Sequence, residues 1–138
     1  MGTRSLTFVF EKYGNKQFPI INMYRQMDGY PSGHGAELAE FLNGFNIVNG
    51  YNSDTPTKSA NGMGCLAAQL VANFKKGIGQ FRLEPAEARD CGQDYEYHIS
   101  ENGNGVLNVS IFDSYREENI FDGSVAELVN FCNVTEEV

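Results

Sequence analysis

Hydrophobic and polar residues alternate, or form short apolar runs, in several separate parts of this chain. Such segments are typical of β-strands. The pattern predicts strands at 6–10, 18–27, 80–84, 95–99 and 107–111. Ile120 and Phe121 are compatible with one more short strand. Turn-forming residues at 13–16 and 101–105 join neighbouring strands and predict two hairpins.

Helical periodicity is clearest between residues 63 and 76. Apolar residues recur there at the spacing of one helix face: Met63, Leu66, Ala67, Leu70, Val71 and Phe74. A shorter helix is predicted at 36–42. A third should follow Ser124, which with Glu127 forms a capping box. Residues 46–62 lack periodicity and are predicted as the longest loop.

The order of these elements, β-β-α-α-β-β-β-α, predicts an α+β fold rather than βαβ alternation. We expect a single domain over residues 1–138, with an antiparallel sheet of about five strands and helices mainly on one face. A length of 138 residues suits one such core. Residues 135–138 are predicted to be a frayed tail.

The charge balance is acidic, with 18 acidic and 10 basic residues and a net charge of −8. This sign disfavours general binding to nucleic acid. Seven acids and one base lie from residue 113 onward, which suits either a solvated face or contact with a basic partner. No apolar run reaches the roughly 18–20 residues of a membrane span. No signal peptide is recognisable, so we expect a cytoplasmic protein.

Metal and cofactor chemistry finds little support in the sequence. The three cysteines, Cys65, Cys91 and Cys132, are odd in number and far apart, which favours neither a disulfide framework nor a zinc site. No nucleophile elbow and no phosphate-loop motif is present. We therefore expect no metal, no cofactor and no catalytic residues.

The richest set of functional groups follows the second predicted strand, where residues 24–35 read YRQMDGYPSGHG. An antiparallel hairpin places the start of its first strand beside the end of its second, so Arg4 and Ser5 should lie next to this loop. Arginines, hydroxyls and N–H groups at a helix start suit phosphate or carboxylate. The predicted ligand-binding residues are Arg4, Ser5, Tyr24, Arg25, Asp28, Tyr30, Ser32, Gly33, His34 and Gly35.

In this interpretation Arg4 and Arg25 pair with phosphate, and the glycine-rich end of the loop donates N–H groups. Tyr24 or Tyr30 stacks on a base, and Asp28 orients an arginine or accepts from a ribose hydroxyl. The two arginines, Asp28 and Tyr30 should then surround one concave site. The alternative is a structural turn, in which Asp28 caps its own backbone and the tyrosine rings fill the core.

Two further sets of residues carry possible functional groups. Residues 59–64 form a second glycine-containing entry to a helix, which matters if it faces the first loop across a cleft. The two histidines, His34 and His98, invite comparison with two-histidine phosphoesterases, in which each histidine acts as acid or base. Those enzymes repeat a His-x-Thr/Ser pattern, and here only His98-Ile99-Ser100 fits it.

The start Met1-Gly2-Thr3-Arg4-Ser5, together with Tyr24 and Asp28-Gly29-Tyr30, resembles a group of small, mostly uncharacterised phage and prophage proteins. Members of that group often carry His and Trp before the Asp, where this chain has Gln26 and Met27. The resemblance implies a phage accessory protein that acts inside a bacterial cell against host defence. Some proteins of this kind bind a host protein, and others sequester a nucleotide second messenger without cleaving it.

These observations lead to three functional hypotheses. The first is a non-enzymatic protein that binds and sequesters a small anionic ligand, with a nucleotide as the expected ligand, and that forms a homo-oligomer. The second is an inhibitor that binds a host defence protein through its acidic C-terminal third. The third is a nucleotide hydrolase that acts through His98 or His34.

Overall fold

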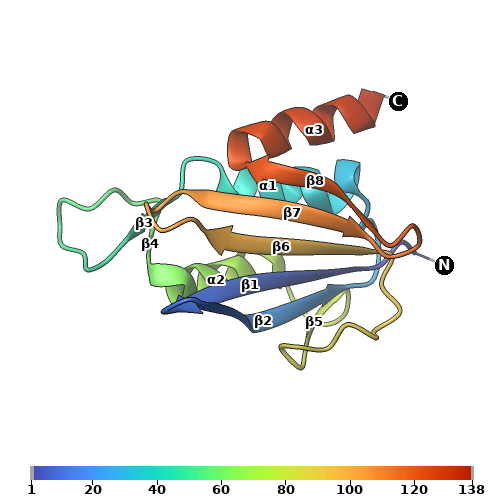
Figure 1. The fold of residues 1–138 in the computed structure, drawn as a ribbon, viewed down its shortest axis with the longest axis horizontal. Helices are drawn as coiled ribbons and strands as arrows, with labels where there is room; N and C mark the ends of the chain where they lie inside the picture. The colour runs from blue at the N-terminus through green and yellow to red at the C-terminus, as the bar shows by residue number, and fades with distance from the viewer. Residues whose placement is uncertain (1, 138) are drawn as a thin grey trace.

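The computed structural model describes residues 2–137, and the side chains of residues 2–133. Six strands form one mixed sheet in the order β5-β2-β1-β6-β7-β8 (Figure 1). Their bounds are β1 (Ser5–Tyr13), β2 (Lys16–Arg25), β5 (Phe81–Glu84), β6 (Tyr95–Glu101), β7 (Leu107–Asp113) and β8 (Glu118–Ser124). The α+β class is confirmed. The prediction of about five strands was wrong by one, because residues 118–124 form a full strand.

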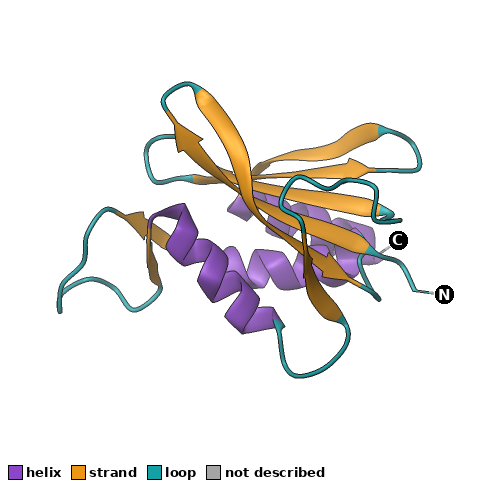
Figure 2. Ribbon diagram, turned by 90° about the horizontal axis from the view of Figure 1, so that it is seen from below, coloured by secondary structure: helices purple, strands orange, loops and turns teal. Residues whose placement is uncertain are grey.

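The helices cover one face of this sheet (Figure 2). They are α1 (Ala36–Leu42), α2 (Gly62–Phe74) and α3 (Val125–Glu137), and one π-helical turn, η1 (Pro31–Gly35), leads directly into α1. The predicted helices at 36–42 and after Ser124 are confirmed. The helix predicted at 63–76 is also present but ends at Phe74, because the backbone of Lys75 is extended. At the start of α3 the capping box is also confirmed, since the N–H of Ser124 donates to Glu127 Oε1 at 2.8 Å and the N–H of Glu127 to Ser124 Oγ at 3.2 Å.

The segment predicted as one long loop has structure at both ends. β3 (Asn46–Val48) and β4 (Ser59–Asn61) pair in parallel as a separate two-stranded sheet. Residues 49–58 between them remain a loop, which projects from the body of the molecule in Figure 1. Three-residue strands carry too little periodicity to be visible in sequence. The backbone of α3 is helical to Glu137. The predicted frayed tail, residues 135–138, includes Val138, which lies outside the described residues, and its fraying stays a prediction.

We had predicted an antiparallel sheet, and this prediction was wrong, because the main sheet is mixed. β1 pairs antiparallel with β2, but on its other side it pairs in parallel with β6, from Ser5 opposite Tyr95 to Val9 opposite Ile99. The parallel pair arises because residues 85–94 carry the chain from the edge strand β5 back across the sheet to the far side of β1. The predicted N-terminal hairpin and the hairpin at 101–105 are confirmed.

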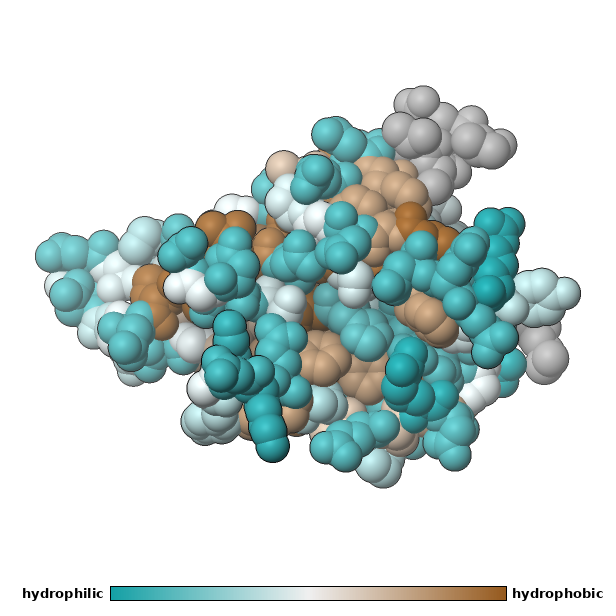
Figure 3. Space-filling model, viewed as in Figure 1, coloured by the Kyte–Doolittle hydropathy of each residue, from teal (hydrophilic) through white to brown (hydrophobic). Residues whose placement is uncertain are grey.

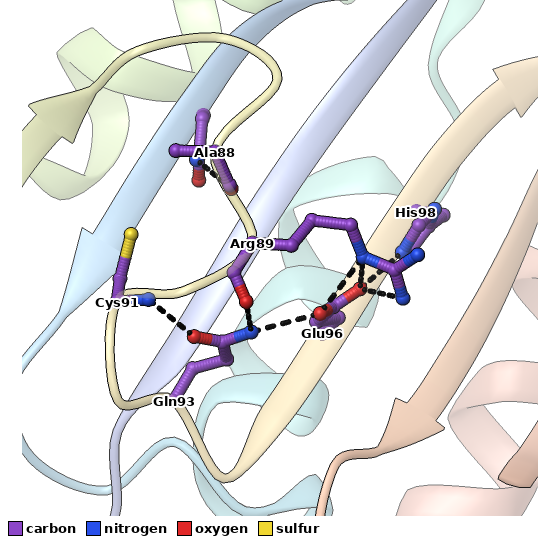
Figure 4. Close-up of polar contacts among 7 residues, drawn as sticks. Ala88, Arg89, Cys91, Gln93, Glu96 and His98 are labelled. Carbon is purple, nitrogen blue, oxygen red and sulfur yellow. Dashed lines mark hydrogen bonds and ion pairs between the residues drawn. The ribbon is translucent and has the colours of Figure 1, made fainter. Parts of the chain in front are cut away.

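β1 is buried on both faces, as is usual for a strand inside a mixed sheet. Val9 packs with the helices in the main core, together with residues such as Leu38, Leu66 and Tyr97. Leu6 and Phe8 point to the opposite face and pack there with Tyr24, Phe10 and Cys91. Cys91 belongs to the segment 85–94, which therefore covers part of the face that the helices leave open (Figure 4).

Candidate functional site

The loop of residues 24–35 is closed by its own hydrogen bonds. Arg25 and His34 are 5% and 0% exposed. Arg25 Nη1 lies 3.1 Å from His34 Nδ1, and His34 Nε2 lies 2.7 Å from the hydroxyl of Thr7 in β1. Arg25 Nη2 donates to Glu37 Oε2 at 3.1 Å. These four side chains form a continuous chain of hydrogen bonds from the sheet to the first turn of α1.

The protonation state of His34 follows from its partners. An arginine nitrogen can only donate, so Nδ1 of His34 must accept and the ring proton sits on Nε2, which donates to Thr7. Burial, and secondly the charge of Arg25, lower the pKa of His34 to about 3. His34 is therefore neutral at physiological pH and has no access to solvent, so it is not placed to act as a surface acid or base.

The backbone of the loop is fixed against the start of β1. Gly29 donates to the carbonyl of Thr3 at 2.9 Å, and its own carbonyl accepts from the hydroxyl of buried Tyr97 at 2.7 Å. A Cβ on Gly29 would stand 2.9 Å from Ser5, so only glycine fits this contact. The predicted closeness of the loop to the start of β1 is thereby confirmed, and Ser5 lies opposite Arg25 in the pairing of β1 with β2.

The predicted ligand-binding residues nevertheless divide between the two faces of the sheet. Arg25 lies on the helix side, whereas the guanidinium of Arg4 approaches Gly92 in the segment 85–94, on the opposite side. Tyr24 is also on that side, where its ring lies 3.9 Å from the guanidinium carbon of Arg82. The two arginines therefore do not meet around one concave site, because neighbouring positions along paired strands point to opposite faces.

The remaining loop residues serve the turn itself. Asp28 adopts a left-handed backbone conformation, with φ of 63°, and accepts from the hydroxyl of Tyr30 at 3.2 Å. Gly33 and Gly35 lie within η1, where an added Cβ would press on the carbonyl of Asp28 and on Cys132 respectively. Ser32 is half-buried beside them. A part in ligand binding stays a prediction for these residues.

A cleft of about 640 Å³ lies directly beside this network, between α1 and α2. Four phenylalanine rings line it, and successive centroids are 5.1, 6.2 and 5.5 Å apart along the series Phe45, Phe41, Phe74 and Phe81. Polar groups surround the rings, and these are Glu37, Glu40, Thr57, Lys58, Gln69, Asn73 and Lys76.

The loop network supports the wall of this cleft. Arg25 ties down Glu37 and lies 5.1 Å from the centroid of the Phe81 ring. His34 lies 5.2 Å from the centroid of Phe74. Arg25 and His34, which the sequence predicted as ligand-binding residues, therefore contact the lining residues from the side away from the cavity. The cleft itself is lined by residues that the sequence reasoning missed.

A signal for the cleft was present in the sequence. Gln69 and Asn73 follow the i, i+4 spacing of one helix face, along the polar border of the apolar stripe of α2, and Lys76 comes just after the helix ends. Phe41 and Phe45 are also four residues apart. The residues of the two helices meet at one cleft only because α1 packs against the end of α2, and no local sequence pattern reveals that contact.

Comparison with protein-family models, with curated proteins and with solved structures finds no match to this chain. Its function must therefore be argued from the geometry of its own residues.

The opposite face of the sheet carries a second polar cluster (Figure 4). Glu96, only 2% exposed, accepts hydrogen bonds from Arg89, from Gln93 and from His98, whose Nε2 lies 3.0 Å away. Burial on its own would raise the pKa of Glu96, but these hydrogen bonds bring it below its ordinary value. The His98 ring stacks on Phe10 at 5.3 Å.

This cluster anchors the segment 85–94 to the sheet, because Arg89 and Gln93 both come from that segment. Figure 3 shows the same face, where hydrophilic residues prevail and apolar ones form smaller patches between them. His34 and His98 lie on opposite faces of the sheet, so the two histidines do not share a groove.

The second glycine-containing helix entry does not face the first loop. Gly62 begins α2 with φ of 84°, and no side chain caps the helix there. The hollow at this end is lined by residues of β3, of β4 and of the 101–105 turn. It lies at the end of the molecule opposite to the loop 24–35 in Figure 1.

Several acids of the C-terminal third have local structural roles. Asp113 accepts from the N–H groups of its own turn, Asp122 from Asn108, and Glu127 from Ser124. Glu117, in the β7–β8 turn, and Glu118, the first residue of β8, are exposed. Within the described residues no group of His, Cys, Asp and Glu could hold a metal ion, and no helix is long and apolar enough to cross a membrane.

Proposed function

We propose that this protein binds and sequesters a small anionic ligand with an aromatic ring, a nucleotide, in the cleft between α1 and α2. The observation that carries the proposal is the combination of four phenylalanine rings with two lysines and two side-chain amides around one cavity of about 640 Å³. This volume lies within the usual range for small-molecule sites, and the polar residues around the rings make the lining more polar than is usual for such sites.

Each part of a nucleotide has a matching group in the cleft. A base stacked on an aromatic ring gains roughly 1–3 kcal/mol, and Phe45 is the half-buried ring nearest to a lysine. The amide of Asn73 has no hydrogen-bond partner among the described residues, so it is free to bond the edge of a base. Lys76 is exposed at the end of α2 and suits a phosphate.

Lys58 contributes in a different way. Its ammonium group donates to the backbone carbonyls of Glu40 and Asn43 at the end of α1, and it lies 5.6 Å from the centroid of Phe45. These contacts hold a positive charge at one end of the cleft, while Lys76 supplies one from α2. Glu37 and Glu40 line the cleft as well, so the attraction for an anionic group is local to the two lysines.

Binding without cleavage is the reading that the lining supports. The residues that line the cleft are aromatic, amide, carboxylate, lysine and threonine side chains, and neither histidine of the chain is among them. The resemblance of the N-terminal residues to phage and prophage proteins would make such a binder an anti-defence protein that removes a nucleotide second messenger in the host cytoplasm. That role, and assembly into a homo-oligomer, belong to the proposal.

Calorimetry tests the proposal directly. The purified protein is titrated with a panel of nucleotides that includes cyclic nucleotides and ADP-ribose derivatives. Phe45→Ala and Lys76→Gln should each weaken binding about tenfold, in line with the loss of a stacking or charged contact. Lys16→Gln, which removes the same charge at the exposed tip of the β1–β2 hairpin, should bind as the wild type does. Absence of heat with every nucleotide, from well-folded protein, would refute the proposal.

A specific feature favours a second candidate, an inhibitor that binds a host defence protein. The β7–β8 turn exposes Tyr115 to 93% beside Glu117 and Glu118, and an exposed tyrosine with charged neighbours is typical of binding hot spots. This candidate predicts salt-sensitive capture of a partner from host lysate, and its loss on replacing Tyr115 by Ala and Glu118 by Lys. Capture that is unchanged by both substitutions would count against it.

A further inference from the structure

All three nitrogens of the Arg25 guanidinium are engaged. Nε donates to the carbonyl of Met27 at 2.6 Å, Nη1 to His34 and Nη2 to Glu37, each at 3.1 Å. His34 in turn is bonded to Thr7 in the centre of the sheet. Because an arginine with every nitrogen bonded and only 5% exposure has one available geometry, it fixes the oxygen Oε2 of Glu37 at the wall of the cleft.

The second oxygen of Glu37 is free to meet a ligand. The side chain is 51% exposed, and no described residue donates a hydrogen bond to Oε1. Glu40 also lines the cleft, but its carboxylate has no comparable anchor among the described residues. Phe81 lies against Arg25, and Phe41 follows Glu37 by one helical turn, so the fixed carboxylate stands beside the aromatic rings.

We propose that Glu37 accepts hydrogen bonds from the ribose hydroxyls of the bound nucleotide, and that Arg25 is its positioning residue. This inference rests on the proposed function and deepens it. The phosphate is an unsuitable partner for Glu37, because a carboxylate repels it. The base is expected to stack on the phenylalanine rings. The sugar hydroxyls are the part of a nucleotide that is uncharged and rich in donors, and two adjacent hydroxyls match the acceptors of a carboxylate.

The consequence is selection for ribonucleotides over deoxyribonucleotides. Loss of the 2′-hydroxyl would leave the Glu37 oxygen with one donor fewer inside the cleft. A hydrogen bond to a charged group is worth about tenfold or more in affinity. A site that reads a hydroxyl in this way discriminates more sharply than one that relies on apolar contact alone.

The experiment compares ADP with 2′-deoxy-ADP by calorimetry, and repeats the comparison for every ribonucleotide of the panel that binds. The wild type should bind the 2′-deoxy form about tenfold more weakly or worse. Glu37→Gln should reduce this difference to about threefold or less, because a neutral amide is a weaker acceptor. Glu87→Gln removes the same charge from the segment 85–94 on the other face, and should leave the difference unchanged.

Arg25→Lys separates positioning from charge. It keeps the positive charge but loses the planar fork, so the preference for ribose should shrink while ADP still binds. Far-UV circular dichroism checks that this buried substitution has folded; if it has not, the half-exposed Glu37→Gln variant decides alone. Equal binding of ADP and 2′-deoxy-ADP by the wild type, or a preference that survives Glu37→Gln, would overturn the inference and leave the proposed function standing. No heat with any nucleotide would overturn both.

Discussion

His34 should make this fold sensitive to acid in a way that one substitution can isolate. Its pKa is lowered to about 3 in the folded chain by burial and by Arg25, against 6.5 for an ordinary histidine. Between these values the unfolded chain binds a proton that the folded chain excludes. Stability is therefore complete above about pH 6.5 and is lost as the pH falls toward 3, at about 1.4 kcal/mol per pH unit.

The informative variant is His34→Gln. A glutamine can accept from Arg25 through its oxygen and donate to Thr7 through its nitrogen, which copies the pattern of neutral histidine. It does not titrate. Between pH 6.5 and 5 the wild type should lose about 2 kcal/mol relative to this variant.

Urea unfolding at a series of pH values measures the difference. The chain contains no tryptophan, so far-UV circular dichroism is the suitable signal. Titration of the carboxylates occurs in both proteins and cancels when the variant's stability is subtracted from that of the wild type at each pH. Parallel curves for the two proteins across pH 6.5 to 5 would refute the assignment of His34 as a buried neutral histidine.

Three further substitutions test other parts of the structure by the same unfolding measurement. Thr7→Val should cost about 1–3 kcal/mol, because it leaves the buried Nε2–H of His34 without an acceptor; a change below about 0.5 kcal/mol would contradict the network. Ser124→Ala should cost about 1 kcal/mol through loss of the α3 cap, and no change would mean that the cap is not formed in solution. Glu96→Gln should destabilise the fold at pH 7 and less so as the pH falls below about 4.5, since the lowered pKa of Glu96 stabilises the fold only while the carboxylate is charged; an equal effect at pH 7 and 3 would count against that pKa.

The sequence was most informative where structure is local. The α2 stripe from Met63 to Phe74, the turn at 101–105 and the capping box at Ser124 all depend on contacts within a few residues, and the structure confirms each. It was less informative where segments far apart in the chain meet. Nothing in the alternation of residues 6–10 distinguishes an antiparallel from a parallel neighbour, so the pairing of β1 with β6 was missed.

The same limit explains what happened to the candidate site. Arg25, His34 and Glu37 are close in sequence, and the sequence correctly placed the first two in a shaped loop beside β1. It did not show that burial would turn their groups toward one another instead of toward a ligand. Lys58 and Asn73 come from separate segments and reach the cleft only when α1, α2 and the approach to β4 are packed together.

The parallel pairing of β1 with β6 also constrains how the chain folds. Ser5 and Tyr95 are partners separated by 90 residues, so one edge of the first strand stays open until β6 has been synthesised. Long-range pairing of this kind slows folding and leaves an unpaired strand edge exposed in the meantime. We therefore expect fragments that end before β6 to aggregate. A circular permutant that begins at β6 and joins the natural termini leaves only β7, β8 and α3 between β6 and β1, so it should refold faster than the natural order.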